Sequence, residues 1–292
     1  MTERHRTLGQ KFTRYVVYLS LLYVFVSVGA AWVLTTSWPF GSARGPRTFD
    51  AVEIETSDGV TLQGYSFATF QRPLIVLAHD YHSASGEFQG FATYLSRNGY
   101  DVLLFDFRGH GKSGSSVVSR GVFEVEDVAA VFRYIRSGRT GGLAGVAWIG
   151  VGSGAAAMTF HDEAAELSCS VLINCYDDLE GQLGRDFEDT VHTGLYPVGS
   201  LMASVVEWRL GSPLRTIRPV DELKKLEGRP VLIVQNEGDR NAAGQNIGEV
   251  LAEAAGPYAQ LVIHADDPAL LEGLAEDIGT RQAILDFIDD NL

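Results

Sequence analysis

A small-residue turn at residues 148–158 has the composition of a catalytic turn. An apolar run leads through the glycine frame Gly150-Val151-Gly152-Ser153-Gly154 into the small residues AAAM. A serine in such a turn can act as a nucleophile when a general base activates its hydroxyl. The centre of the frame, however, is Gly152, and Ser153 stands one residue later. Either the nucleophile is missing, or it is Ser153.

The sequence on both sides of this turn has the pattern of a parallel α/β sheet, whose strands and helices would position the turn. Continuous apolar runs, which a sheet covered on both faces requires, alternate with segments whose apolar residues recur at helical spacing. The runs are LIVLA (74–78), VLLFDF (102–107), VAWIGV (146–151), SVLIN (170–174), VLIV (231–234) and LVIH (261–264). Residues 51–67 predict a hairpin around the turn Ser57-Asp58-Gly59. We therefore expect an α/β fold with a mostly parallel, doubly wound sheet that opens with an antiparallel hairpin.

One interval of the domain, residues 178–228, has no strand pattern. It contains the helical segment SLMASVVEWRL. We expect this interval to form a small helical cap inserted into a domain that covers residues 49–292. In open α/β sheets ligands bind at the carboxyl ends of the strands, so a ligand site is expected beneath this cap.

The N-terminal region predicts a membrane anchor. Residues 15–38 are mostly apolar and uncharged, and they exceed the roughly 20 residues that a helix needs to cross a lipid bilayer. A cleaved signal peptide has a shorter apolar core, so we expect a single transmembrane helix. The tail, residues 1–14, carries four Lys or Arg residues against Glu3, which places the N-terminus in the cytoplasm and the domain outside the cell membrane. Residues 39–48, rich in Pro, Gly, Ser and Arg, are expected to be a linker.

Charge and cysteine content limit the partners and cofactors. The net charge of −14 argues against a nucleic-acid partner, because an acidic surface repels polyanions. The two cysteines, Cys169 and Cys175, lie in one expected strand, where about 20 Å between them exceeds disulfide reach. We expect two buried free thiols. The sequence has no His/Cys/Asp cluster with metal-ligand spacing, and we expect neither a metal nor a cofactor.

Residues 50–292 resemble the α/β-hydrolase superfamily and, within it, the serine aminopeptidase-like and monoacylglycerol-lipase-like esterases. The resemblance is densest over RPLIVLAHDYHSASGEFQGFATYLSRNGYDVLLFDFRGHGKSG, which includes His79 and the stretch Asp106-x-Arg108-Gly109-x-Gly111-x-Ser113. The segment IRPVDELKKLEGRPVLIVQNEGD is similar to the family's approach to its acid-bearing strand. In that fold the nucleophile occupies the centre of a G-x-S-x-G turn. The resemblance therefore puts the nucleophile position at Gly152.

The resemblance implies that other catalytic positions are altered as well. Asp239 falls where the family carries the carboxylate that orients its histidine, and Asp267 aligns with the histidine position itself. The oxyanion donors would be the backbone N–H groups of Ser153 and of Asp80, at a position where the family usually has glycine. An inward-pointing carboxylate at Asp80 would oppose the developing negative charge. Among the other histidines, His264 ends its strand about three residues before the aligned position.

Two functions follow from these positions. The first is a membrane-anchored, catalytically inactive relative of serine esterases and peptidases that binds a small apolar ligand or a protein partner. The second is an active serine hydrolase of ester or peptide substrates that uses Ser153 with Asp239. A third interpretation, dinucleotide binding by Gly150-x-Gly152-x-x-Ala155 and Asp177, fits the local pattern. That glycine turn normally follows the first strand of its unit, whereas here it follows the fifth expected strand.

Overall fold

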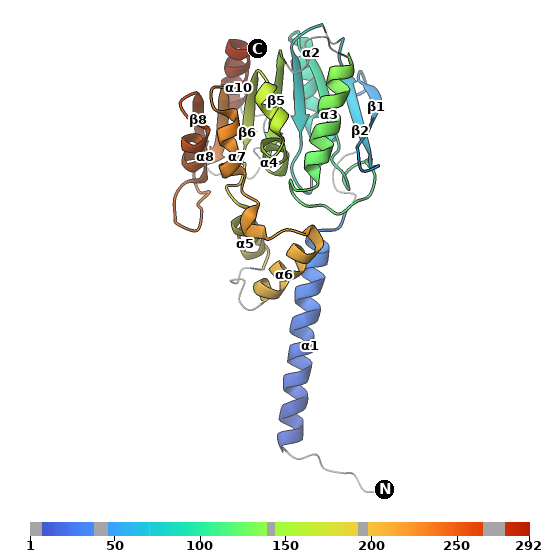
Figure 1. Ribbon diagram of the computed structural model, residues 1–292, viewed down its shortest axis with the longest axis vertical. Helices are drawn as coiled ribbons and strands as arrows, with labels where there is room; N and C mark the ends of the chain where they lie inside the picture. The colour runs from blue at the N-terminus through green and yellow to red at the C-terminus, as the bar shows by residue number, and fades with distance from the viewer. Residues whose placement is uncertain (1–7, 38–45, 70, 139–143, 192–197, 265–277) are drawn as a thin grey trace.

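The computed structural model describes most of the chain (Figure 1). The described residues are 8–37, 46–69, 71–138, 144–191, 198–264 and 278–292. Asp267, which aligns with the histidine position, and most of the expected linker lie outside the described residues.

A single sheet of eight strands forms the centre of the domain, in the order β1-β2-β4-β3-β5-β6-β7-β8. β1 pairs antiparallel with β2, and β2 with β4, whereas all other pairs are parallel. The strands are β1 (Asp50–Glu55), β2 (Thr61–Phe67), β3 (Leu74–Ala78), β4 (Asp101–Phe105), β5 (Val146–Val151), β6 (Cys169–Ile173), β7 (Val231–Asn236) and β8 (Ala259–His264). The expected mostly parallel sheet with an initial hairpin is confirmed.

Helices cover both faces of this sheet. The α-helices are α1 (Leu8–Leu34), α2 (Gln89–Arg97), α3 (Glu124–Gly138), α4 (Ser153–Thr159), α5 (Leu179–Val191), α6 (Val198–Leu210), α7 (Pro219–Glu222), α8 (Ile247–Ala255) and α10 (Ile278–Asn291). Buried residues of α3, α4 and α8 pack on one face, and those of α2 and α10 pack on the other. Successive β3 residues alternate between the two cores, as Leu74 and Val76 face one and Ile75 and Leu77 face the other. Burial on both faces explains why the central strands are continuously apolar.

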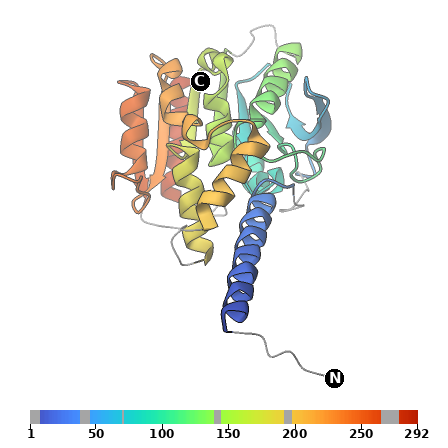
Figure 2. The ribbon, with the colours of Figure 1, turned by 60° about the horizontal axis from the view of Figure 1, so that its bottom comes forward.

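Helices α5 and α6 follow β6, within the interval where we expected a cap. α6 packs against the carboxyl-terminal part of α1, and both views place these helices beside each other (Figures 1 and 2). The guanidinium of Arg209 lies over the ring of Trp32 at 3.9 Å from its centroid. The end of α1 therefore has a packed contact with the domain.

Helix α1 ends earlier than the expected segment 15–38 and also begins earlier, because it covers Leu8–Leu34. The hydroxyl of Thr35 donates to the carbonyl oxygen of Ala31 at 2.7 Å, which satisfies one of the last helical carbonyls. Thr36 then forms an antiparallel bridge with Val117 of the domain. The chain thus leaves the helix by pairing directly with the domain.

Candidate functional site

The turn after β5 is a sharp elbow between a strand and a helix. β5 ends at Val151 and α4 begins at Ser153, while Gly152 between them has φ 50° and ψ −114°. A side chain at positive φ crowds the backbone, so glycine holds this conformation with the least strain. A Cβ atom on Gly150 or Gly154 would lie within 2.6 Å or 2.5 Å of backbone atoms. The glycine frame is therefore required by the close approach of strand and helix.

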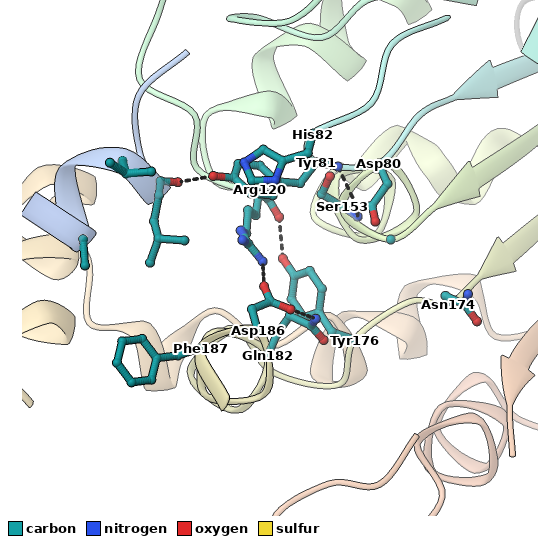
Figure 3. A pocket seen from close by; sticks show the side chains of 14 residues that line it. Asp80, Tyr81, His82, Arg120, Ser153, Asn174, Tyr176, Gln182, Asp186 and Phe187 are labelled. Atoms are coloured by element: carbon teal, nitrogen blue, oxygen red, sulfur yellow. Dashed lines mark hydrogen bonds and ion pairs between the residues drawn. The ribbon is translucent and has the colours of Figure 1, made fainter. Parts of the chain in front are cut away.

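The carboxylate of Asp80 occupies the space in front of Gly152. A Cβ atom on Gly152 would lie 2.0 Å from Oδ1 and 2.3 Å from Oδ2 of Asp80. Oδ1 accepts hydrogen bonds from the backbone N–H groups of Ser153 at 2.7 Å and of Tyr81 at 2.6 Å (Figure 3). Two converging N–H groups are the arrangement that stabilises an oxyanion in acyl-transfer enzymes. In this chain they hold an internal carboxylate.

The expectation that the Asp80 N–H would be the second donor is corrected by this geometry. The N–H that shares an acceptor with Ser153 belongs to Tyr81, and Asp80 supplies the acceptor itself. A short acidic side chain can bend back to accept a hydrogen bond from a nearby backbone N–H. The carboxylate does point inward, which was the condition under which we expected it to oppose oxyanion formation.

The environment of Asp80 is unfavourable to additional negative charge. Loss of solvent is the largest influence and raises its pKa, while hydrogen bonds from Ser153 and Tyr81 and the charge of Arg120 act in the opposite direction. The net effect is a raised pKa. Because ionising one carboxylate here is already costly, a second anion beside it would be still less favourable.

Ser153 is buried at the start of α4, with 9% of its surface exposed. Its backbone N–H donates to Asp80 at 2.7 Å, and its side chain lies near that carboxylate and acts to lower its pKa. In the family the residue after the nucleophile supplies an oxyanion donor, and Ser153 stands at that place in the turn. Its hydroxyl thus faces a carboxylate, whereas a catalytic triad requires a histidine as its partner.

The histidine closest to Asp80 in the sequence, His79, has a structural part. Its Nδ1 lies 2.7 Å from the carbonyl oxygen of Asp80, and its Nε2 accepts a hydrogen bond from the N–H of Phe107 at 2.9 Å. Both ring nitrogens therefore bind backbone groups. Burial, and to a smaller extent the charge of His110, lowers the pKa of His79 to about 3.

Asp239 lies after β7, at the place that the resemblance assigns to the catalytic acid. Its Oδ2 accepts a hydrogen bond from Nε2 of Gln235 at 2.6 Å, and its carbonyl oxygen accepts one from the N–H of Ile247 at 3.0 Å. Asp239 is not among the residues that line the cavity at the elbow. His264 ends β8, opposite Asn236.

A cavity of about 530 Å³ lies in front of the elbow. Its wall is formed by α1, by α5, and by the segments that follow β3, β4, β5 and β6. Asp80, Gly152 and Ser153 lie in this wall, together with Ala30, Val33 and Leu34 of α1. A volume of this size is typical of small-molecule sites. The structure thus places Asp80, Gly152 and Ser153 in a pocket at the carboxyl ends of the strands and beside α5.

Several residues of the cavity had no sequence signal. Arg120 forms an ion pair with Asp186 of α5, and its guanidinium lies 3.8 Å from the centroid of the Tyr81 ring. The hydroxyl of Tyr176 donates to the carbonyl oxygen of Arg120. Figure 3 shows these side chains between α5 and the loop that carries Asp80. They belong to loops and to the cap, where neither periodicity nor a motif indicates proximity.

Comparison with known proteins agrees with this geometry. Residues 70–192 match the family model of the serine aminopeptidases S33. The uncharacterized Bacillus subtilis protein YqkD is 21% identical over 244 residues, which cover 82% of this chain and 79% of that protein. The Pyrococcus furiosus esterase Pf2001 is 20% identical and superposes with a TM-score of 0.64 over 83% of this chain and 92% of its own. A membrane phospholipase A, described as a bacterial virulence factor, is 17% identical with a TM-score of 0.58 over 97% of both chains.

The chain is an α/β-hydrolase-fold protein. The fold that the sequence resembles is therefore confirmed, and the family match over residues 70–192 is consistent with the suspected superfamily. In this hydrolase fold the glycine turn follows β5, so Gly150-x-Gly152-x-x-Ala155 is part of the elbow. The other position of the dinucleotide interpretation, Asp177, follows β6 and is buried, with its Oδ1 3.6 Å from Arg185.

Proposed function

We propose that this hydrolase-fold protein is anchored in a membrane and binds a ligand without hydrolysing it. The observation that carries the proposal is the contact of Asp80 with the N–H groups of Ser153 and Tyr81. An acyl-transfer enzyme needs such donors for the oxyanion of its tetrahedral intermediate. A carboxylate bound to them takes the place of that oxyanion and repels it.

The nucleophile position supports the same conclusion. Gly152 provides no attacking oxygen, and a serine there would place its Cβ atom 2.0 Å from Asp80 Oδ1. The loss of the nucleophile and the inward carboxylate are thus sterically linked. What remains is the elbow, with a cavity in front of it.

Helix α1 supports the anchoring part of the proposal. It is long and apolar enough to cross a bilayer, and most of its large side chains are exposed to solvent in the isolated chain. A structural neighbour described as a membrane phospholipase A aligns over 97% of the chain. With the basic residues 1–14 in the cytoplasm, the cavity would face the outer surface of the membrane.

A fluorophosphonate probe tests for catalysis, because it labels only an activated serine. The full chain in phospholipid nanodiscs is expected to stay unlabelled under conditions that label an active serine esterase completely. Labelling that disappears in Ser153→Ala would contradict the proposal. Weak turnover of an activated ester that persists in Ser153→Ala would not, because such turnover does not use an activated Ser153.

The alternative is a serine hydrolase that uses Ser153. Its support is that Ser153 lines the cavity together with His82. Burial, and next the charge of Arg120, lowers the pKa of His82 to about 4. A base with so low a pKa removes a serine proton poorly. This alternative predicts probe labelling that is lost in both Ser153→Ala and His82→Gln.

A further inference from the structure

The cavity in front of the elbow has an apolar part and a polar part. Ala30, Val33 and Leu34 of α1 and Phe187 of α5 form the apolar part. The polar part is built around Asp80, and Figure 3 shows Phe187 on the opposite side of the Arg120–Asp186 pair from Asp80. Such a cavity fits an amphiphile, whose chain lies against α1 while its head group approaches Asp80.

The charges of the cavity wall oppose an anionic head group. Two carboxylates, Asp80 and Asp186, and one guanidinium, Arg120, are among its described lining residues. Asp186 neutralises Arg120 through their ion pair, so Asp80 in its ionised form leaves the wall with one net negative charge. His82 adds no positive charge at neutral pH, since its pKa is lowered to about 4.

The polar part also offers hydrogen-bond acceptors. The buried Oδ1 atom of Asn174, another lining residue, has no hydrogen-bond partner in the protein. A buried carbonyl oxygen without a partner is costly, and a ligand donor that reached it after a local side-chain movement would remove that cost. Nε of Arg120 is likewise buried without a partner.

Both N–H groups that would bind an anionic oxygen are already occupied. The Ser153 and Tyr81 donors end on Oδ1 of Asp80. A carboxylate or phosphate head group would have to displace Asp80 or approach it without these donors. A hydroxyl or ammonium group can instead donate to Asp80, and a charge-assisted hydrogen bond is stronger than a neutral one.

We propose that this cavity binds a single-chain amphiphile whose head group donates a hydrogen bond to Asp80, an aliphatic amine or alcohol, and that it discriminates against carboxylate and phosphate head groups. This inference rests on the proposed function, because it takes the cavity to be a binding site. The proposed preference for an amine or alcohol is the reverse of that of an oxyanion site, which would favour a negatively charged group.

Radiolabelled dodecylamine, dodecanol and dodecanoate test the charge preference at constant chain length. Binding to the full chain in phosphatidylcholine nanodiscs is measured as the excess over empty nanodiscs. Dodecylamine is expected to bind at least about tenfold more tightly than dodecanoate, with dodecanol between them or equal to the amine. The relative affinities of the amine and the alcohol show whether charge or hydrogen bonding dominates.

Matched variants assign the preference to Asp80 and the chain site to α1. Asp80→Asn keeps the side-chain size and an oxygen for the two N–H groups, and it should reduce the amine-to-dodecanoate ratio below about threefold. Asp50→Asn, an exposed carboxylate of β1, should leave the ratio unchanged. Val33→Trp should weaken binding of all three probes, whereas Val17→Trp, exposed on α1 and outside the cavity lining, should not.

Three results would overturn the inference: dodecanoate binding as tightly as dodecylamine, an unchanged ratio in Asp80→Asn, or no excess binding of any probe. None of them would imply catalysis. Fluorophosphonate labelling through Ser153, in contrast, would overturn the proposed function whatever the order of the affinities.

Discussion

In both the loop after β4 and the elbow after β5 the polar groups bind other parts of the protein, but only at the elbow would the same groups bind a substrate in an active hydrolase. In the loop, Arg108 pairs with Asp127 at 2.7 Å and with Asp58 at 2.7 Å. Asp106 accepts hydrogen bonds from the backbone of Ser85 at 2.8 Å and of Lys112 at 3.0 Å. These side chains bind other parts of the protein. At a catalytic elbow, the backbone N–H groups would instead bind the reacting substrate.

Under the proposed function, this difference accounts for an elbow without its reaction beside a loop that keeps its family-like motif. Removing a partner from the loop leaves a buried charge unpaired, which is costly. The elbow's N–H groups need only an acceptor, and Asp80 provides one. Folding therefore requires the polar groups of the elbow to be satisfied, whereas it does not require them to be catalytic.

The largest expected effect is on the loop side of the comparison. Arg108→Ala leaves Asp127, whose side chain has 0% exposure, without its guanidinium. We expect a loss of about 3–5 kcal/mol in the free energy of unfolding, measured by urea denaturation of the full chain. The control Arg136→Ala breaks two more exposed ion pairs and should cost about 0–1 kcal/mol. Equal losses in the two variants would show that the buried ion pair stabilises the fold no more than the exposed pairs do.

An intermediate effect is expected at the elbow. Gly152→Ser should lower the free energy of unfolding by about 1–3 kcal/mol through backbone strain, with a further loss from the collision with Asp80. Adding Asp80→Ala to Gly152→Ser should restore the part of the free energy of unfolding that the collision removes. The double-mutant cycle should then give an interaction energy of about 1 kcal/mol or more between the two positions.

Gly59→Ser is the matched control for this cycle. Gly59 also has a positive φ of 86°, but nothing lies within 4 Å of its Cβ position. Gly59→Ser should therefore lower the free energy of unfolding by the same amount with and without Asp80→Ala. Purely additive losses for Gly152→Ser and Asp80→Ala would mean that the two positions are not sterically linked.

The last effect depends on pH and is smallest near neutral pH; it concerns His79, which contacts both regions through Phe107 and Asp80. The unfolded chain protonates this imidazole near pH 6.5, whereas the folded protein keeps it neutral down to about pH 3. The unfolded state thus binds more protons, and the free energy of unfolding should fall as the pH is lowered from about 6.5 towards 3. His79→Gln should make this dependence shallower. An unchanged slope would assign it to other groups, such as His82.

The sheet could be predicted from the sequence because its signal is local. The runs LIVLA and VAWIGV have the same bounds as β3 and β5, since strands covered on both faces must be apolar throughout. The glycine frame also located the elbow, because only small residues permit its backbone contacts.

The details of the site depended on contacts that a sequence does not contain. The N–H group that donates beside that of Ser153 belongs to Tyr81, one residue after the expected Asp80. This shift of one residue depends on how the chain leaves β3. Arg120 and Asp186 come together from segments far apart in the sequence. The contribution of α1 to the cavity was also missed, because neither the apolar composition of residues 15–38 nor any motif indicates that Leu34 and Thr36 contact the domain.

The docking of α1 has a practical consequence for how this protein can be studied and how it sits on a cell. The hydroxyl of Tyr81 donates to the carbonyl oxygen of Leu34 at 3.0 Å, next to the Asp80 that fills the elbow. A truncated form that begins after α1 would lose the proposed anchor and one wall of the cavity together. If α1 spans the bilayer, the cavity is held at a fixed height and tilt above the lipid surface. A flexible linker between α1 and the domain would fix neither the height nor the tilt of the cavity.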